Sequence, residues 1–281
     1  MANGTGTGRK QESKNSRPDY VIRGGHEGKR RLELLGRIMW PTTFQLLKRT
    51  GIRKGMACLD LGCGGGDVTL GLARLVGSGG RAVGIDMDSF KLDAARQEAQ
   101  RQQLGNVAFQ QANIYEWSAE LTYDRIYARF LITHLPDCVA ALSTMRRALR
   151  PGGVLIIEDI DFTGSFCYPP CSAYNRYVEL YRQVVRCRKG DADIGPKLHG
   201  LLRDAGLQSV HMSLVHPFHV DQEEKQLSLS TLVNIAGAVL SESLAQPSEL
   251  EKIIAELQEF TDDPTTVLGL PRVFQAWGSR L

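Results

Sequence analysis

The chain has 281 residues, of which 42% are hydrophobic, enough for one large domain or two small ones with a buried core. Its 34 basic and 31 acidic residues leave a net charge of +3, without the basic surplus of a dedicated nucleic-acid-binding protein. No apolar run approaches a membrane span and the six cysteines lack zinc-site spacing, so we expect no membrane partner, no metal and a reduced, cytoplasmic setting.

The first fifty residues divide into two parts. Residues 1–18 are rich in Gly, Ser, Asn and Lys without aromatic or β-branched periodicity, which predicts a disordered tail. Residues 19–50 place leucines and isoleucine at helical spacing, followed by a break at Trp40-Pro41. We expect this helical segment to cover one side of a sheet or to act as a lid over a binding site, with Tyr20 near its mouth.

A glycine-rich turn lies within Met56–Thr69. Met56–Leu61 predicts a short apolar strand and Asp67 begins a helix, so a ligand can approach bare backbone beside a helix N-terminus. The dinucleotide fingerprint requires a sixth-position glycine, where this chain has Asp67. Asp60, near the end of the strand, would repel a pyrophosphate and attract an ammonium or sulfonium group. The turn therefore predicts a nucleotide-type site for a cationic ligand.

The pattern Asp60-Leu61-Gly62-Cys63-Gly64-Gly65-Gly66 resembles motif I of class I S-adenosylmethionine (SAM)-dependent methyltransferases. SAM carries both an ammonium and a sulfonium group. The resemblance implies that Asp60, Gly62, Cys63 and Gly64 bind this cofactor.

Strands and helices alternate after the turn. A helix over 66–75, a strand over Arg81–Asp86 and a helix over 89–104 predict a parallel sheet with helices on both faces. Asp86 ends its strand where a carboxylate can accept both ribose hydroxyls of a nucleotide. The family resemblance implies the same role for Asp86 and adds Met87 as a contact to the adenine.

Three further residues match cofactor positions of the resembling family. Asn113, at the end of the third predicted strand, replaces the aspartate that commonly bonds the adenine amino group, and its amide oxygen can still accept that bond. Ile114 is a candidate for packing against the adenine or in the core. Arg129 follows the fourth predicted strand, where the family closes over the methionine part of SAM. Its guanidinium would pair with the cofactor carboxylate or with a core acid.

The segment Leu149-Arg-Pro-Gly-Gly before an apolar strand at Val154–Asp159 is another feature shared with this family. The strand ends in the acidic run 158–161, which would orient a substrate amine, accept a proton or hold a divalent ion, or only cap and solvate the strand edge. Asp159, His134 and Tyr20 are the candidate general bases. His134 is nearest the cofactor by motif position, and the alternative for it is a helix cap.

Two insertions depart from the minimal sheet. Residues 162–192 carry tyrosines and valines at helical spacing, and residues 217–262 contain two helical stretches, while strands over 209–216 and 271–278 form an antiparallel edge. With the segment 19–50, these insertions are expected to converge over the carboxyl ends of the strands. Tyrosines there suit a planar or apolar acceptor, or only pack the insertion onto the fold.

The ordered motifs predict one SAM-binding methyltransferase domain over 51–281, with a Rossmann-like, seven-stranded, mostly parallel α/β sheet, helices on both faces and a helical lid. The Asn-Pro-Pro-Tyr-type motif of base-modifying methyltransferases is absent, because residues 128–131 are Ala-Arg-Phe-Leu. A small molecule remains as the partner. The chain resembles the ubiquinone-biosynthesis-like and natural-product branch of the family, which implies transfer to oxygen, or to nitrogen or carbon, of a secondary metabolite.

Two other functions stay open. A SAM-binding protein without methyl transfer, such as a cyclase or a sensor, would carry the same cofactor motifs. A thiol-dependent, arsenite-type methyltransferase would need Cys167, Cys171 and Cys187 to converge. The sequence also leaves a homodimer open.

Overall fold

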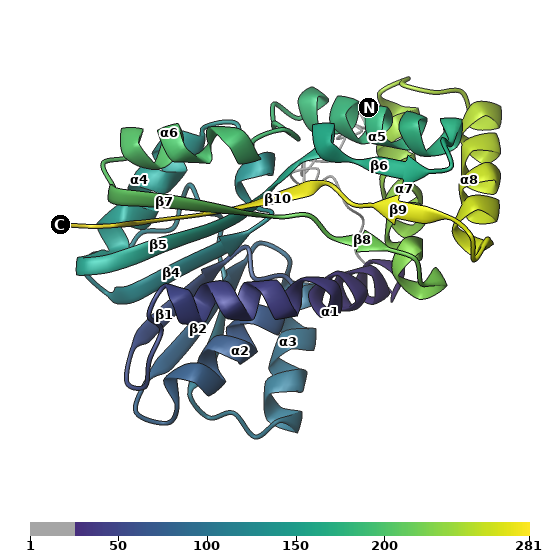
Figure 1. Cartoon of the computed structure of the whole chain (residues 1–281). Coiled ribbons are helices and arrows are strands. Elements are labelled where there is room, and N and C mark those ends of the chain that lie inside the picture. The colour runs from purple at the N-terminus through teal and green to yellow at the C-terminus, as the bar shows by residue number, and fades with distance from the viewer. Residues whose placement is uncertain (1–25) are drawn as a thin grey trace, which may run out of the picture.

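The computed structural model describes residues 26–281 (Figure 1). The predicted tail at 1–18 and the candidate base Tyr20 lie outside the described residues. Within the described part of the chain, no helix is both long and apolar enough to span a membrane.

A central sheet of seven strands organises the molecule. The strand order is β3-β2-β1-β4-β5-β10-β7. The strands β3, β2, β1, β4 and β5 are parallel, and β10 is antiparallel to both of its neighbours. This arrangement confirms the predicted Rossmann-like α/β fold. The strands are β1 (Ala57–Leu61), β2 (Arg81–Asp86), β3 (Val107–Gln111), β4 (Tyr123–Arg129), β5 (Leu149–Asp161), β7 (Gln208–Val215) and β10 (Arg272–Ser279).

Helices cover both faces of this sheet (Figure 1). Side chains alternate between the faces along each strand, so Cys58 and Tyr127 pack on one side while Leu59 and Ala128 pack on the other. The first face is covered by α1 (His26–Arg49), α2 (Asp67–Val76) and α3 (Ser89–Arg101), and the second by α4 (Cys138–Ala148) and α6 (Leu198–Asp204).

Two predicted boundaries are wrong. Helix α1 continues through Pro41, where the sequence predicted a break. The Trp40 ring fills the space over Gly71, where an added Cβ would lie 2.1 Å from the ring, and the Thr43 hydroxyl donates a 2.6 Å hydrogen bond to buried Glu158. These contacts with α2 and the sheet offset the cost of about 3 kcal/mol that an internal proline imposes.

The second wrong boundary is the start of strand β5. This strand already begins at Leu149, before the glycine pair that was expected to precede it.

The two insertions form a separate layer at the carboxyl end of the sheet (Figure 1). Helices α5 (Ser172–Cys187), α7 (Gln222–Ser241) and α8 (Pro247–Asp262) share one apolar core with Phe162 and with Met39 of α1. A small antiparallel sheet joins them, formed by β6 (Phe166–Tyr168), β9 (Val267–Gly269) and β8 (Phe218–His219). Its strands of two or three residues are too short for an alternating pattern and were not predicted from the sequence.

Helix α1 bridges the two layers. Its C-terminal half packs on the sheet through Leu46 and Leu47, while Arg31, near its N-terminus, bonds to Thr231 of α7 at 2.9 Å. The helix therefore extends from one face of the sheet to the insertion layer, and its role as a lid stays a prediction.

Candidate active site

The turn between β1 and α2 holds its glycines in a conformation that other residues rarely adopt. Gly62 and Gly66 have φ angles of 69° and 80°, and a Cβ at Gly66 would lie 2.9 Å from Ala95 and Phe109. The amides of Gly62 and Cys63 donate to the Ile85 carbonyl at 2.8 and 3.0 Å. The turn is thus fixed to the end of β2 and leaves its backbone open to a ligand.

Asp86 joins this turn to the end of β2. One carboxylate oxygen accepts the Gly64 amide and the other accepts the Asp88 amide, both at 2.9 Å. A carboxylate oxygen has two lone pairs, so each oxygen retains the capacity for a second donor. The neighbouring Met87 side chain is 41% exposed, which leaves its thioether free to contact a bound molecule.

Asp60 is buried at the end of β1 and accepts a 2.7 Å hydrogen bond from the Thr69 hydroxyl. Burial raises the pKa of its carboxyl to about 7, although the Thr69 bond acts in the opposite direction. A cation placed beside this carboxylate would favour its ionised form.

Arg129, the last residue of β4, forms an ion pair with Asp67 at 2.7 Å, and its side chain is 10% exposed. Burial alone would lower the pKa of Arg129, but the Asp67 carboxylate outweighs this effect and keeps the pKa above its ordinary value. Its Nη1 atom is buried without a hydrogen-bond partner among the described residues. The arginine therefore pairs with an acid of the protein and retains one donor for a further acceptor.

One cavity of about 1680 Å³ connects these groups. Of the predicted cofactor residues, six line it: Asp60, Gly62, Cys63, Gly64, Asp86 and Arg129. Met87, Asn113 and Ile114 are not part of its lining. The Asn113 side-chain oxygen accepts the Tyr115 amide at 3.0 Å, and Ile114 packs in the core of the second sheet face. Their contacts with the adenine stay predictions.

The far part of the same cavity lies between the sheet and the insertion layer and has aromatic walls. The rings of Phe162 and Tyr181 stack at 4.1 Å with an interplanar angle of 11°. The wall consists mainly of apolar and aromatic side chains: Ile160, Phe162, Tyr177, Tyr181, Leu270 and Val273. The tyrosine-rich helix thus contributes to the cavity, as well as to the core of its own layer.

The two described candidate bases differ in position. His134, in the short 3₁₀ turn Ile132–His134 after β4, lines the cavity. Burial, followed by the positive charge of Arg31, lowers the pKa of His134 to about 4, so its imidazole is neutral near pH 7. Asp159 is fully buried outside the cavity lining, and its oxygens accept the amides of Thr133 and Ile160 at 3.1 and 2.9 Å. Of the two, only His134 faces the cavity.

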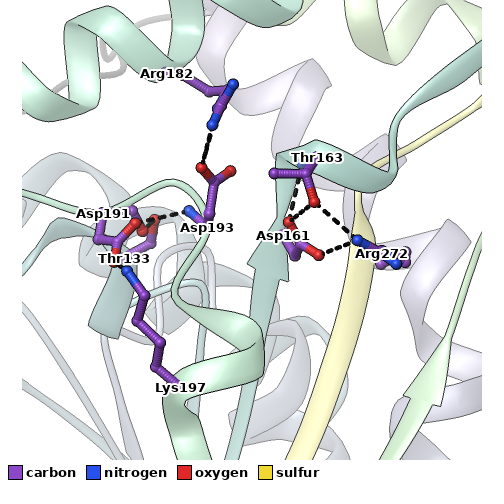
Figure 2. Close-up of polar contacts among 8 residues, drawn as sticks. All are labelled: Thr133, Asp161, Thr163, Arg182, Asp191, Asp193, Lys197 and Arg272. Atoms are coloured by element: carbon purple, nitrogen blue, oxygen red, sulfur yellow. Dashed lines mark hydrogen bonds and ion pairs between the residues drawn. The ribbon is translucent and has the colours of Figure 1, made fainter.

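The last acid of β5 is occupied by partners within the protein. Asp161 accepts bonds from the Thr163 amide and hydroxyl at 2.9 and 2.6 Å and forms an ion pair with Arg272 at 2.5 Å (Figure 2). These contacts tie the end of β5 to β10. Figure 2 shows that nearby acids are paired as well: Asp191 with Lys197, and Asp193 with Arg182.

The cysteines of the insertion do not converge. Cys171 and Cys187 lie at opposite ends of α5, a helix of 16 residues that spans about 24 Å. Among the described residues, no group of three metal-binding side chains occurs. The geometry required for a thiol-dependent methyltransferase is therefore not met.

Four buried polar residues of the cavity were not predicted from the sequence: Arg31, Ser228, Thr231 and Asn234. Each is less than 9% exposed. Arg31 lies four residues before Leu35, on the apolar side of α1, and Ser228 and Thr231 interrupt the apolar side of α7. A charged or hydroxyl side chain within an apolar helical stripe was the available signal.

Comparisons with known proteins agree with this geometry. A family model described as a methyltransferase domain matches residues 52–206. The ubiquinone/menaquinone biosynthesis C-methyltransferase UbiE of Klebsiella pneumoniae is 29% identical over 220 residues, which cover 70% of this chain and 86% of that protein.

Two solved structures share the fold at low sequence identity. The phosphoethanolamine N-methyltransferase 2 of Haemonchus contortus, in complex with SAM, is 18% identical with a TM-score of 0.54, covering 89% of this chain and 57% of that one. The [4+2]-cyclase SpnF is 15% identical with a TM-score of 0.56, covering 86% and 80%. Because the family model matches more than half of its residues, this chain belongs to the methyltransferase-domain family, as a class I SAM-dependent methyltransferase of small molecules.

Proposed function

We propose that this enzyme transfers the methyl group of SAM to an oxygen atom of a small secondary metabolite with a planar, apolar body. The observation that carries the proposal is the single cavity that runs from the glycine turn to the stacked pair Phe162 and Tyr181. Flat aromatic walls favour a planar ligand, and a common cavity allows the ligand to meet the cofactor.

The polar groups of the near part fit SAM. The Asp60 carboxylate suits its ammonium or sulfonium, the Asp86 carboxylate has acceptor capacity for the ribose hydroxyls, and the buried Nη1 of Arg129 lacks an acceptor that a carboxylate would supply. When bound, SAM supplies a methyl group on a positively charged sulfur. Met87, at the rim of the turn, is proposed to contact the adenine.

Placement and exclusion of water are the main tasks of this chain's own residues. Helix α1 and the insertion layer enclose the far part of the cavity, so an acceptor atom there is shielded and held in one orientation. The neutral imidazole of His134 lines the same space and is proposed to accept a proton from the acceptor. Its low pKa makes it a weak base, so we assign it a secondary role.

Among the charged groups of the cavity, Arg31 favours an oxygen over an amine as the methylated atom. Arg31 is buried in the wall, and a protonated amine would be repelled by this guanidinium. Carbon is the alternative, because the relative UbiE is named as a C-methyltransferase.

The test is incubation of the protein with methyl-labelled SAM and a panel of phenols, carboxylic acids and amines, followed by mass spectrometry of the products. The proposal expects labelled methyl ethers or esters of planar acceptors. Labelled carbon would move the assignment to C-methylation, and N-methylation alone would contradict the proposal. Saturable SAM binding without any product would support the rival, a SAM-binding protein that does not transfer methyl groups.

A further inference from the structure

A buried arginine, Arg31, lies in the wall of the cavity and has no anionic partner among the residues that the structure describes. Arg31 is 8% exposed, lines the cavity and donates through Nε to the Thr231 hydroxyl at 2.9 Å. Among the described residues it forms no ion pair with a carboxylate. A buried guanidinium with only a neutral hydroxyl as partner carries a desolvation cost that an anion would offset.

Three hydroxyl groups line the cavity near this guanidinium, and one of them, Thr231, bonds to it. Ser228 and Thr231 are three residues apart on one side of α7, and both line the cavity with Tyr177 of α5. The buried Ser228 hydroxyl lies near the Tyr177 phenol but forms no well-aligned hydrogen bond in the described part of the chain. Burial raises the pKa of Tyr177 to about 12, with Arg31 acting in the opposite direction, so the phenol remains a donor near neutral pH. We call these four residues the Arg31 subsite.

The Arg31 subsite is built from α1 and the insertion layer, whereas the charged groups of the glycine turn belong to the sheet and its first helix. Arg129, at the end of β4, pairs with Asp67 at the start of α2. Arg31, on α1, bonds instead to Thr231 of α7 in the insertion layer. The stacked rings of Phe162 and Tyr181 line the same cavity. The cavity therefore combines a flat apolar wall with a cluster of donors around one positive charge.

We propose that the Arg31 subsite binds an oxyanion of the methyl acceptor, a carboxylate or a phenolate, while the planar body of the acceptor packs against Phe162 and Tyr181. This inference rests on the proposed function and narrows its substrate class to acceptors with an acidic oxygen. A guanidinium with neighbouring hydroxyls is suited to two or more charge-assisted hydrogen bonds to one oxyanion. A cationic acceptor would be excluded.

The experiment measures binding rather than turnover. Four naphthalene probes of one shape, 2-naphthoate, 2-naphthol, 2-naphthamide and 2-naphthylmethylamine, are titrated calorimetrically into the protein saturated with S-adenosylhomocysteine. We expect 2-naphthoate to bind at least about tenfold more tightly than 2-naphthamide, and the amine not to bind. Titration of 2-naphthol distinguishes a phenolate from a carboxylate as the preferred oxyanion. Ionised naphthol bound at the subsite absorbs at a longer wavelength than neutral naphthol.

Variants of Arg31 test whether this residue causes the preference for the acid over the amide. Arg31→Gln is expected to abolish the preference for the acid over the amide, and Arg31→Lys to retain part of it, since it keeps the charge without the planar fork. The matched control Arg49→Gln, an exposed arginine of the same helix outside the cavity lining, is expected to leave the preference unchanged. S-adenosylhomocysteine affinity is expected to stay within about twofold in all three.

Four results would overturn the inference: equal binding of acid and amide, tighter binding of the amine, failure of every probe to bind, or an acid preference that survives Arg31→Gln. A loss of S-adenosylhomocysteine affinity in Arg31→Gln, with the acid preference intact, would assign Arg31 to the cofactor carboxylate instead. Acid binding without a methylated product would contradict the proposed function while leaving the subsite in place.

Discussion

Replacing Asp60 with asparagine removes a buried charge and keeps an oxygen that can accept the Thr69 hydrogen bond. In the folded protein the pKa of Asp60 is about 7, against 3.8 for an unperturbed side chain. This difference of about three pH units corresponds to about 4 kcal/mol. Because the folded-state pKa is raised, the wild-type protein is most stable below pH 3.8 with respect to this group, and it loses this stability as the pH rises through about 7.

Urea unfolding of both proteins at pH 5 and at pH 8 measures this effect, since the contributions of other titrating groups cancel in the difference between variant and wild type. Asp60→Asn is expected to gain stability relative to wild type, and the gain at pH 8 is expected to exceed the gain at pH 5 by about 3 kcal/mol. A gain that does not depend on pH would refute the reasoning about the buried carboxylate.

The same variant tests the cofactor role of Asp60. Calorimetric titration of SAM at pH 8 is expected to show a loss of affinity of about tenfold or more, because an amide cannot pair with the cationic groups of SAM. Below pH 7 the wild-type affinity is expected to fall toward that of the variant, as the carboxyl becomes protonated. Unchanged SAM affinity in Asp60→Asn would remove Asp60 from the proposed cofactor site.

Three further changes probe the frame around the site. Thr43→Val takes a donor from buried Glu158 and is expected to cost about 1–3 kcal/mol in urea unfolding; no loss would show that the contact contributes nothing to docking α1. Gly71→Val would clash with the Trp40 ring and is expected to lower stability by about 2 kcal/mol, whereas Gly79→Val, in a turn with open space around it, serves as its control. Met87→Ala is expected to weaken SAM binding about fivefold with less than about 0.5 kcal/mol change in stability, and equal SAM affinity would refute the adenine contact.

The sheet and its helices were predictable because their signals are local. The alternation of apolar strands and periodic helices, the glycine turn and the Asp86 carboxylate lie in short segments whose order in the chain fixes a parallel sheet. The break expected at Pro41 failed for the opposite reason. Its helix continues because Trp40 packs over Gly71 and Thr43 bonds to Glu158. Both partners are distant in the chain, so no local pattern reveals these contacts.

Six of the predicted cofactor residues line the cavity, whereas the buried polar groups of its far part were not predicted. The residues of the glycine turn belong to a contiguous motif, whereas Arg31 meets Thr231 across 200 positions. Asp159 shows a related limit, since the sequence gives its place at the end of a strand but not the direction of its side chain, which backbone amides hold outside the cavity. Long-range pairing and side-chain direction required the structure.

One continuous cavity is proposed to bring SAM to a planar acceptor with an acidic oxygen. The most direct measurement is mass spectrometry of reactions with methyl-labelled SAM and the paired acceptors 2-naphthoate, 2-naphthol and 2-naphthylmethylamine, using wild type and Arg31→Gln. We predict labelled methyl on the oxygen of the acidic acceptors with the wild-type protein and at least about tenfold less with Arg31→Gln. Labelled product from the amine alone, or equal oxygen methylation by both proteins, would contradict this account.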